Sequence, residues 1–594
     1  SVYCFGSGET PPVELAAAPA AAAGGEAVFA KAAEEIVQRT GVTQGYCLDL
    51  ACGDGRLALE LARRTKLRIC AFDADPAQVA AARQMLDAAG LYGVRVAVHQ
   101  AEPAALPYPQ GVADLVVSGR SVLDGAETIP EGALAELPRP HGGVVCLGRP
   151  GALRQSARGP LAGAGSWTHL YAGPANTVCS DDACLKGPLQ MRWFRDTDLL
   201  MPSRHGRGPA PLVADGRMFV AGLDALRAVN IYNGADLWQV PLPKMLAAYH
   251  QDHLTGVAAT GSNLCLGGDR LFVHTGDRCL SLDVKTGSQV AEFPAPAAPE
   301  GQPGRWGYIA WQDGVLFGSV ADQRHVVTES WSAYRGKLDM TSLLSESRLL
   351  FARDAQTGRQ LWNFKPQHSI RHNAIALAPG RVYLIDRPLA EGDRPVSDSA
   401  KTSTAHPTGR LVCLDAQTGQ VLWEDGRDIF GTLLAVSEPH GVLVMSYQAT
   451  RFSLASERGG RLAGFRTSDG TRLWDAEAKY RSRPVLIGGA VYAEPEKFDL
   501  LTGKALPFEF ARSYGCGILA GSQRLLVYRS ATLGYYDLEG NQKTENYGGI
   551  RPGCWINAIP AGGLVLLADA ASWCTCSYLN QATIALEPAS AAGE

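Results

Sequence analysis

Residues 45–55 read Gly-Tyr-Cys-Leu-Asp-Leu-Ala-Cys-Gly-Asp-Gly. The apolar run at the start of this stretch is typical of a buried strand, and the residues that follow, 56–64, have the periodicity of a helix. Gly53 and Gly55 allow the backbone of the intervening turn to approach a ligand. The N-terminus of the helix that follows favours a negatively charged group on that ligand. The stretch therefore predicts a strand, a ligand-binding turn and a helix in succession.

The same alternation continues to about residue 150. Further strands are expected at 67–72, 94–98, 113–117 and 142–147, with a helix at 76–89. Strands that alternate with helices pair in parallel and form a Rossmann-like α/β domain. We expect this domain to end after its fifth strand, without a further strand or an acceptor-binding cap.

Three motifs of this domain carry a specific resemblance. LDLACGDG (48–55), FDAD (72–75) and HQAEPAALPYP (99–109), which leads into ADLVVSG, resemble motifs I to IV of class I methyltransferases that use S-adenosylmethionine (SAM). The resemblance implies that SAM is the cofactor. By this resemblance, the methionine end of SAM is held by Asp49, Gly53 and Gly55, the ribose is held by Asp73, and the adenine lies by Glu102.

NAD is the alternative cofactor. A carboxylate about 20 residues after the glycines, as at Asp73, can also accept the ribose hydroxyls of a dinucleotide. The dinucleotide motif Gly-x-Gly-x-x-Gly needs glycine at three positions. In this chain these positions hold Ala51, Gly53 and Arg56, so only the second matches. This departure favours SAM over NAD.

A different pattern fills the rest of the chain. Asp354-Ala-Gln-Thr-Gly-Arg-Gln-Leu-Trp362 returns with two changes at 415–423. Related phrases occur at 230–238, 283–287, 467–474, 499–503 and 537–540. In such a phrase Asp starts a tight turn, Gly takes its positive-φ position, and the next strand carries an apolar or Trp side chain. Together with strands in 556–587 and a closing strand at 189–194, the turns predict an all-β propeller of eight blades, with seven as the alternative.

This phrase resembles the PQQ-like repeat, which occurs in quinoprotein alcohol dehydrogenases and in non-catalytic assembly propellers. Quinoprotein dehydrogenases carry a vicinal Cys-Cys disulfide over their cofactor, and this chain has no Cys-Cys pair, so we expect no PQQ. The predicted organisation is an N-terminal extension (1–27), the SAM-methyltransferase-like domain (28–150), a linker that leads into the propeller (151–188) and the propeller (189–594).

Arginine or histidine precedes nearly every predicted inner strand of the propeller. Converging Arg and His side chains can bind an anionic or carbohydrate ligand in the central channel, and a His can act as acid or base. The candidate catalytic residues are Arg204, His205, His253, Arg371, His372, Arg512 and Arg551. Trp306 and Trp555 are candidates for stacking on a sugar. Alternatively, each Arg satisfies carbonyls and carboxylates around the channel. No metal site is expected.

Composition narrows the class of partner. The formal net charge is −4, with no basic block, which disfavours nucleic acid, and no apolar stretch is long enough to span a membrane. Cys179 with Cys184, and Cys516, Cys554, Cys574 and Cys576, lie in loops and predict disulfides, hence an exported protein in the periplasm or outside the cell. The first residue, Ser1, is consistent with removal of a signal or tag. An active SAM domain predicts the cytoplasm instead.

Three functions remain open. The first is a SAM-dependent methyltransferase whose propeller binds the acceptor or a protein partner. The second is an enzyme whose propeller channel acts on a carbohydrate or anionic substrate, with the α/β domain vestigial or holding NAD. The third is a non-catalytic exported binding scaffold.

Overall fold

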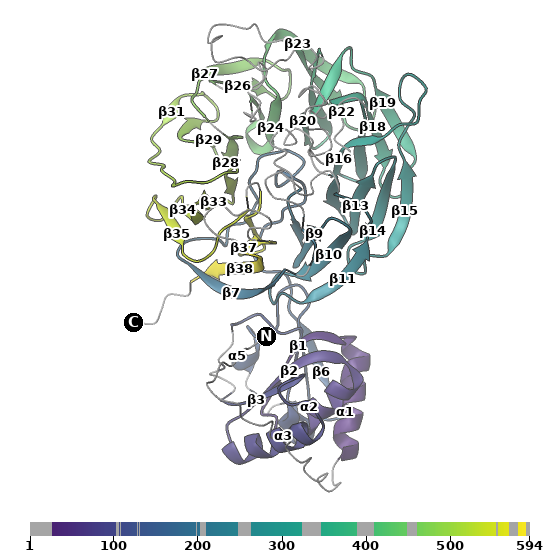
Figure 1. The fold of residues 1–594 in the computed structure, drawn as a ribbon, viewed down its shortest axis with the longest axis vertical. Helices are drawn as coiled ribbons and strands as arrows, with labels where there is room; N and C mark the ends of the chain where they lie inside the picture. The colour runs from purple at the N-terminus through teal and green to yellow at the C-terminus, as the bar shows by residue number, and fades with distance from the viewer. Residues whose placement is uncertain are drawn as a thin grey trace, which may run out of the picture. The chain divides into compact units, whose positions relative to one another are not determined.

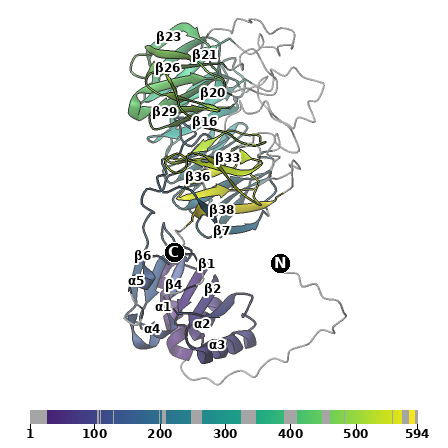
Figure 2. The ribbon, with the colours of Figure 1, turned by 90° about the vertical axis from the view of Figure 1, so that its left-hand side faces the viewer.

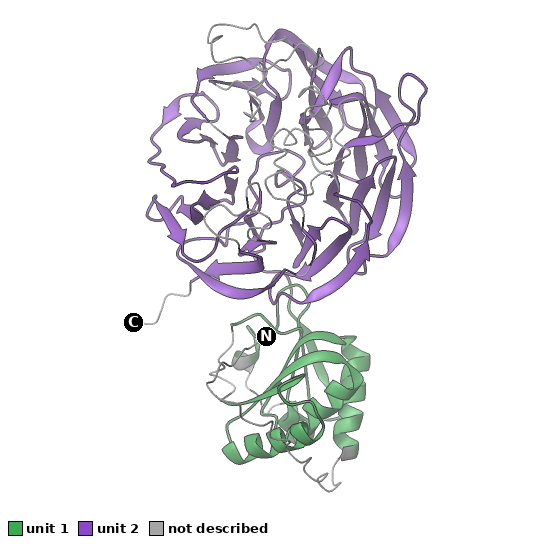
Figure 3. Ribbon diagram, in the orientation of Figure 1, with its two compact units in different colours: residues 1–159 green, residues 160–594 purple. Residues whose placement is uncertain are grey.

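The computed structural model of the chain divides into two compact units, residues 1–159 and 160–594 (Figure 3). The structure describes residues 26–589 apart from 103–105, 107–108, 127–128, 130, 198, 202–208, 247–262, 323–345, 389–408, 448–459, 481, 554–555 and 570–579.

The first unit contains a six-stranded sheet with the strand order β3-β2-β1-β4-β5-β6. Its strands are β1 (Gln44–Leu50), β2 (Lys66–Asp73), β3 (Val96–Gln100), β4 (Leu115–Val117), β5 (Val144–Leu147) and β6 (Arg154–Ala157). Its helices are α1 (Glu26–Thr40), α2 (Arg56–Arg64), α3 (Pro76–Ala88), α4 (Gly119–Asp124) and α5 (Glu131–Leu134). Strands β1 to β5 pair in parallel, which confirms the Rossmann-like α/β fold.

Strand β6 differs from the sequence prediction, which placed no strand after β5. It pairs antiparallel with β5 along its whole length. All four of its residues, Arg-Gln-Ser-Ala, are exposed, so this edge strand carries no apolar alternation that a sequence pattern could reveal.

The two faces of this sheet are covered unequally. Side chains of the three long helices α1, α2 and α3 pack together with one face, where Val144 and Cys146 of β5 lie. The alternate residues of β5, Val145 and Leu147, enter a separate and smaller apolar cluster on the other face. In the described chain, the residues that join this second cluster from outside the strands are Ala51, in the turn after β1, and residues of short segments within 101–137, rather than residues of a long helix.

The second unit is built of antiparallel sheets arranged around a centre (Figures 1 and 2). One four-stranded sheet contains β8 (Leu212–Ala214), β9 (Arg217–Ala221), β10 (Ala225–Asn230) and β11 (Asp236–Pro241), and the next contains β12 (Leu264–Gly267), β13 (Arg270–Thr275), β14 (Arg278–Asp283) and β15 (Gln289–Pro294). An eight-stranded sheet follows, with β16 (Trp306–Gln312), β17 (Val315–Ala321), β18 (Glu346–Asp354), β19 (Gln360–Phe364), β20 (Ser369–Ala378), β21 (Arg381–Arg387), β22 (Gly409–Asp415) and β23 (Val421–Ile429).

Four more four-stranded sheets complete the ring. They are formed by β24 (Leu433–Ser437), β25 (Val442–Ser446), β26 (Arg461–Arg466) and β27 (Arg472–Glu477); by β28 (Val485–Ile487), β29 (Ala490–Ala493), β30 (Glu496–Asp499) and β31 (Ala505–Leu506); by β32 (Ala520–Gly521), β33 (Leu525–Ser530), β34 (Thr532–Asp537) and β35 (Thr544–Tyr547); and by β36 (Ile559–Ala561), β37 (Leu564–Leu567), β38 (Ala582–Pro588) and β7 (Leu189–Asp196). The pairing of β7 with β38 confirms that the segment 189–194 closes the ring.

The repeated phrase contacts its next copy as well as turning the chain. In the copy that starts at Asp354, a carboxylate oxygen of this residue accepts bonds from the backbone N–H groups of Gln356 and Thr357. Trp362 ends this copy, and its indole donates to the carbonyl of Ala416 in the next copy at 2.9 Å. A Cβ on Gly419 would lie only 2.6 Å from the Trp362 ring, so the glycine admits the indole as well as the positive φ. The turn that starts at Asp415 thus packs against the Trp of the preceding copy.

Residues 163–185, which we call the channel segment, bond to every sheet of the second unit. Five of its carbonyl oxygens, those of Trp167, Thr168, Ala175, Thr177 and Val178, accept backbone N–H groups of Val213, Leu266, Val436, Leu486 and Gly521. Leu377 on β20 likewise donates to a carbonyl of this segment, that of Pro174. Trp311 on β16 donates to the imidazole of His169, and Ser180 donates its hydroxyl to a carbonyl of β36.

Burial lowers the pKa of His169 to about 3, so the imidazole is neutral and can accept the Trp311 bond. The sequence analysis had placed part of this segment in a linker. Its contacts make it an integral part of the second unit.

Candidate functional site

Asp49 lies at the end of β1, at the edge where the parallel strands of the first unit terminate; we call this the carboxyl edge. Its side chain is fully buried. One carboxylate oxygen accepts the backbone N–H of Gly119 at 2.7 Å, and the other, Oδ2, is buried with no hydrogen-bond partner among the described residues. Burial raises the pKa of Asp49 to about 7, assisted by the nearby charge of Asp73 and opposed by the Gly119 bond. A buried acceptor without a partner suits a ligand that brings a cation or a hydrogen-bond donor.

The turn after β1 brings backbone groups to the same edge. Gly53 has φ +59° and Gly55 has φ +82°, both in the left-handed region that glycine adopts without steric cost. A Cβ on Gly55 would come within 3.0 Å of Ala82 on α3, so glycine also allows α2 and α3 to approach. Ala51 takes φ +49° in the same turn, although it has a Cβ. Ala51 is therefore strained, and it lies two residues after Asp49, whose Oδ2 has no hydrogen-bond partner among the described residues.

Gly119 is a site residue that the sequence analysis did not single out. It begins α4 directly after β4 and donates to Asp49 from a position 70 residues further along the chain. A Cβ here would lie 2.6 Å from the carbonyl oxygen of Cys52, so only glycine permits this approach of α4 to the turn. A glycine immediately after an apolar strand, as in VVSG at 116–119, was the available signal.

The two other predicted cofactor residues lie at the ends of β2 and β3. Asp73 is buried, and its carboxylate accepts the backbone N–H groups of Gly53 at 2.9 Å and Asp75 at 3.0 Å. A carboxylate has about four acceptor positions, so these two bonds leave capacity for hydroxyl donors. Glu102 follows β3, where its side chain is exposed. Asp49, Gly53, Gly55 and Asp73 therefore converge on one edge, with Glu102 at the neighbouring strand end.

The predicted channel residues of the propeller have a different character. Arg204, His205 and His253, together with Trp555, lie outside the described residues. The described candidates Arg371, His372 and Arg551 are buried.

Arg371 forms a buried ion pair with Glu346 at 2.8 Å, and Ser369 donates to the other oxygen of this carboxylate. The charge of Arg371 is thus balanced by a partner within the protein.

His372 belongs to a chain of hydroxyl groups. Its Nε2 lies 2.7 Å from Oγ of Ser347, and this hydroxyl donates its hydrogen to Ser319 Oγ at 2.7 Å. Because Ser347 has one hydrogen and gives it to Ser319, the hydroxyl accepts from His372 instead of being activated by it. A Cβ on Gly307 would lie 2.6 Å from Nε2, so these groups are closely packed. The geometry here does not resemble a Ser–His nucleophile pair.

The remaining candidates are also engaged in packing. Arg512 pairs with Glu494 at 2.7 Å. Trp306 is buried and packs against Phe351 and the stacked ring of His274, so it is not available to a sugar. Arg483 lies over the ring of Tyr171 in the channel segment, with 3.7 Å between the guanidinium carbon and the ring centroid. The described channel candidates are therefore engaged with groups of the protein itself.

The disulfide prediction is wrong for the pair that the structure describes. Cys179 and Cys184 are both free thiols, and each donates to a backbone carbonyl, those of Ser180 and Ala162. Cys554, Cys574 and Cys576 lie outside the described residues. The error arose because both cysteines stand in an irregular segment, which resembles a disulfide-bonded loop in sequence but is held by backbone bonds to the ring.

Two further searches of the described residues gave negative results. No group of three or more His, Cys, Asp or Glu side chains in this part of the chain could hold a metal ion. Among its helices, none is both long and apolar enough to cross a membrane.

Family models match part of each unit. Residues 47–139 match the family model described as a methyltransferase domain, and residues 305–497 match the model described as outer membrane protein assembly factor BamB. Both resemblances are confirmed. The first unit is thus a methyltransferase-type domain, and the second carries PQQ-like repeats. A search of curated protein sequences finds no match.

Solved structures give two corresponding similarities. A protein of Methanococcus maripaludis assigned as a SAM-dependent methyltransferase is 26% identical over 20% of this chain and 55% of its own, with a TM-score of 0.19. BamB of Moraxella catarrhalis is 14% identical over 58% of this chain and 97% of its own, with a TM-score of 0.33. The chain thus spans about half the length of the methyltransferase structure that it matches.

Proposed function

We propose that this protein is a SAM-dependent methyltransferase whose first unit binds the cofactor and whose propeller binds the acceptor or a protein partner. The observation that carries the proposal is the buried Oδ2 of Asp49, which has no partner among the described residues and lies beside a turn of positive-φ glycines at the carboxyl edge. SAM presents an ammonium group, ribose hydroxyls and a sulfonium, and it supplies a methyl group to a nucleophile.

The residues at the carboxyl edge fit these groups. The Asp49 carboxylate would accept a hydrogen bond from the ammonium group of SAM. This bond would supply the missing partner for Oδ2, and the positive charge would favour the ionised form of the carboxyl. The backbone around Gly53 and Gly55 would lie along the methionine end, and Asp73 has acceptor capacity left for the ribose. Glu102, at the next strand end, would lie by the adenine. The absence of glycine at Ala51 favours SAM over NAD.

For the propeller we infer eight blades. The channel segment contacts β8, β12, β16, β20, β24, β28, β32 and β36, which are eight strands spaced four apart. The eight-stranded sheet divides naturally between its two halves, because β18 and β20 are joined by only two residue pairs. Because the described channel candidates already have partners within the protein, we place binding on the outer surfaces of the propeller rather than chemistry inside its channel. Because the export prediction depended largely on disulfides, we place the protein in the cytoplasm, where SAM is available.

Calorimetry on the full chain tests the proposal. We expect SAM to bind and NAD not to bind, and we expect Asp49→Asn to weaken SAM binding at pH 8 by about tenfold or more, since a charge-assisted bond is lost. Asp54→Asn is the matched control: Asp54 lies in the same turn but is already paired with Arg56 at 2.9 Å. Absence of SAM binding at millimolar concentration, or an equal effect of both variants, would refute the proposal.

A further inference from the structure

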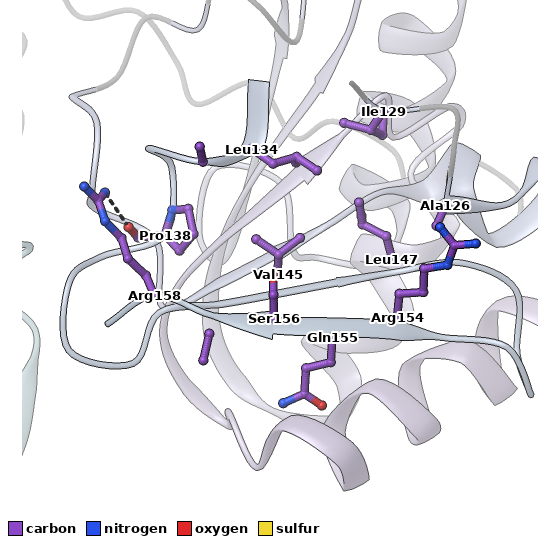
Figure 4. Close-up of a pocket in the computed structure, with 12 residues that line it drawn as sticks. Ala126, Ile129, Leu134, Pro138, Val145, Leu147, Arg154, Gln155, Ser156 and Arg158 are labelled. Carbon is purple, nitrogen blue, oxygen red and sulfur yellow. Dashed lines mark hydrogen bonds between the residues drawn. The ribbon is translucent and has the colours of Figure 1, made fainter. Parts of the chain in front are cut away.

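Two of the cavities among the described residues have volumes in the usual range for sites that bind small molecules. One, of about 420 Å³, lies in the first unit over Val145 and Leu147 of β5 (Figure 4). Arg158, which lines it, forms an ion pair with Glu136 and donates to the carbonyl of Pro138, so its charge is balanced within the protein (Figure 4). The other, of about 310 Å³, lies in the second unit, where the repeated phrase indicates which side chain is missing from it.

Four copies of the phrase end in a Trp whose surroundings are alike. Each indole donates to a backbone carbonyl in the turn of the next copy, at 2.9 to 3.1 Å. On the neighbouring strand, a small residue lies opposite each Trp. We call these surroundings the Trp position. The indole, its carbonyl acceptor and the small residue are, in chain order, Trp238 with Val284 and Ala228, Trp362 with Ala416 and Ala352, Trp423 with Thr467 and Cys413, and Trp474 with Leu500 and Gly464.

The copy 499–503 lacks its Trp. In the copies 354–362 and 415–423 the Trp stands eight residues after the first Asp, and the eighth residue after Asp499 is Pro507. Proline has no backbone N–H with which to continue a ladder, and β31 ends one residue earlier. The outer strand of this sheet is therefore cut short where an indole would stand.

The cavity of about 310 Å³ lies where this Trp is missing. Pro507 lines it from one sheet, and Leu538 lines it from the next copy. Leu538 holds the same place in its copy as Leu500, the acceptor of Trp474, holds in the copy before. The Leu538 carbonyl accepts the side-chain amide of Gln542 at 3.2 Å in place of an indole. The acceptor of the Trp position is thus present without its ring.

One other copy lacks its Trp, and there the protein fills the position itself. After the copy 283–287, the buried ring of Phe293 takes the place of the indole, since a Cβ on Gly358 in the next copy would lie only 2.3 Å from that ring. Phe508 follows the copy 499–503 but is only half-buried, and it lines the cavity instead of filling it. The space is therefore particular to this sheet.

Two further lining residues stand at register positions that face a Trp in other sheets. Phe317 pairs with Ala352, Ala352 pairs with Trp362, and the Phe317 ring lies 6.1 Å from the indole between centroids. In the same way Tyr492 on β29 pairs with Lys497 on β30, and both line the cavity. The Trp position thus keeps its aromatic neighbour, but a cation replaces the small residue.

Two lysines make the lining positively charged. Lys497 and Lys543 both line the cavity, with the ammonium nitrogen of Lys497 5.0 Å from the centroid of the Tyr492 ring. No ion pair is found for either lysine among the described residues. Glu509 contributes one carboxylate to the lining against these two ammonium groups. An anionic group on a ligand is therefore favoured beside the lysines.

We propose that this cavity binds a small indole carboxylic acid. Its ring takes the place of the missing Trp, its ring N–H donates to the Leu538 carbonyl in exchange for the Gln542 amide, and its carboxylate lies at Lys497 and Lys543. The ligand thus makes the contacts that the protein makes with its own Trp in four other copies. This binding goes beyond the proposed function and does not depend on SAM, because every residue invoked belongs to the second unit.

Calorimetry on the full chain tests the inference with indole-3-acetate as the probe. The probe should bind, and two analogues should bind more weakly. 1-Methylindole-3-acetate, which lacks the N–H donor, should lose about fivefold, and 3-methylindole, which lacks the carboxylate, should lose about tenfold or more, since a hydrogen bond to a charged group is stronger than a neutral one.

A lysine variant tests the position of the carboxylate. Lys497→Gln should weaken the binding of indole-3-acetate about tenfold and leave that of 3-methylindole unchanged, because only a charge-assisted bond is lost. Lys504→Gln is the matched control: Lys504 belongs to the same copy of the phrase, is exposed and does not line the cavity.

A second pair of variants tests the location. Pro507→Trp supplies the residue found in the other copies and should abolish binding of all three compounds, whereas Pro507→Ala should preserve it. If the melting temperature shows that Pro507→Trp does not fold, Asn541→Trp places a ring in the cavity from an exposed lining residue of the next copy. The inference is overturned if indole-3-acetate does not bind, if the two lysine variants behave alike, or if a folded Trp variant binds it with unchanged affinity.

Discussion

Replacement of Asp49 by Asn is expected to stabilise the first unit at high pH. The pKa of this carboxyl is raised from 3.8 to about 7 in the folded chain. Because folding raises this pKa, the protonated Asp49 carboxyl stabilises the folded state fully below about pH 4, and this stabilisation is lost as the pH rises through 7. A shift of about three units corresponds to about 4 kcal/mol between these limits, at about 1.36 kcal/mol per unit.

The amide of Asn has nearly the shape of the protonated carboxyl and does not ionise. Asp49→Asn should therefore match the unaltered protein near pH 4 and exceed its stability by about 4 kcal/mol at pH 8. Hydrogen-exchange mass spectrometry of peptides from β1 and α4 in the full chain gives this free energy locally, separately from the propeller. The reasoning is refuted if the variant is equally or less stable at pH 8, or if Asp54→Asn gives the same pH-dependent gain. The same titration predicts that SAM binds the unaltered protein more weakly as the pH falls below 7, because protonation removes the acceptor charge.

Three further outcomes are expected. Ala51→Gly should stabilise the first unit by about 1 kcal/mol, because glycine adopts the observed φ of +49° without strain; denaturant unfolding followed by hydrogen exchange measures this, and a loss of stability would contradict it. Asn176→Gly should destabilise the propeller by about 2 kcal/mol, since it removes the amide that donates to two inner-strand carbonyls while tolerating the positive φ; an unchanged melting temperature of the second unit would count against this role. Cys179 and Cys184 should both react with a maleimide in denaturant without reductant, and protection of the pair from alkylation would restore the disulfide.

Sequence patterns predicted several elements whose side chains alternate between core and solvent, although they missed α1. The helix expected at 56–64 has the same bounds in the structure, because its apolar residues recur with helical spacing. The closing strand at 189–194 was predictable because a ring of antiparallel sheets needs a partner for its last strand. Strand β6 was not predictable, since its four exposed residues pair through the backbone alone.

The candidate site was predictable only in part. Motif spacing placed Asp49 and the glycines in one turn, but the partner of Asp49 lies 70 residues away and depends on how β4 is placed next to β1. For the propeller, Arg371 and His372 looked like the rim of a channel because a sequence pattern does not distinguish a charged side chain in water from one with a buried partner. The pairing of Arg371 with Glu346 depends on the contact between β18 and β20.

The position of the channel segment in the chain has a consequence for folding. Residues 163–185 precede the ring strands β8 to β38, yet the segment bonds to partners as distant as Pro560 and Gly563, 380 and 381 residues from their respective partners. During synthesis the channel segment leaves the ribosome before the sheets to which it later bonds. Contacts of such sequence separation carry a large loop-closure entropy and slow the search for the native state. A chain released before residue 563 would therefore leave the hub of the ring incomplete. Separate expression of the propeller should begin upstream of residue 163.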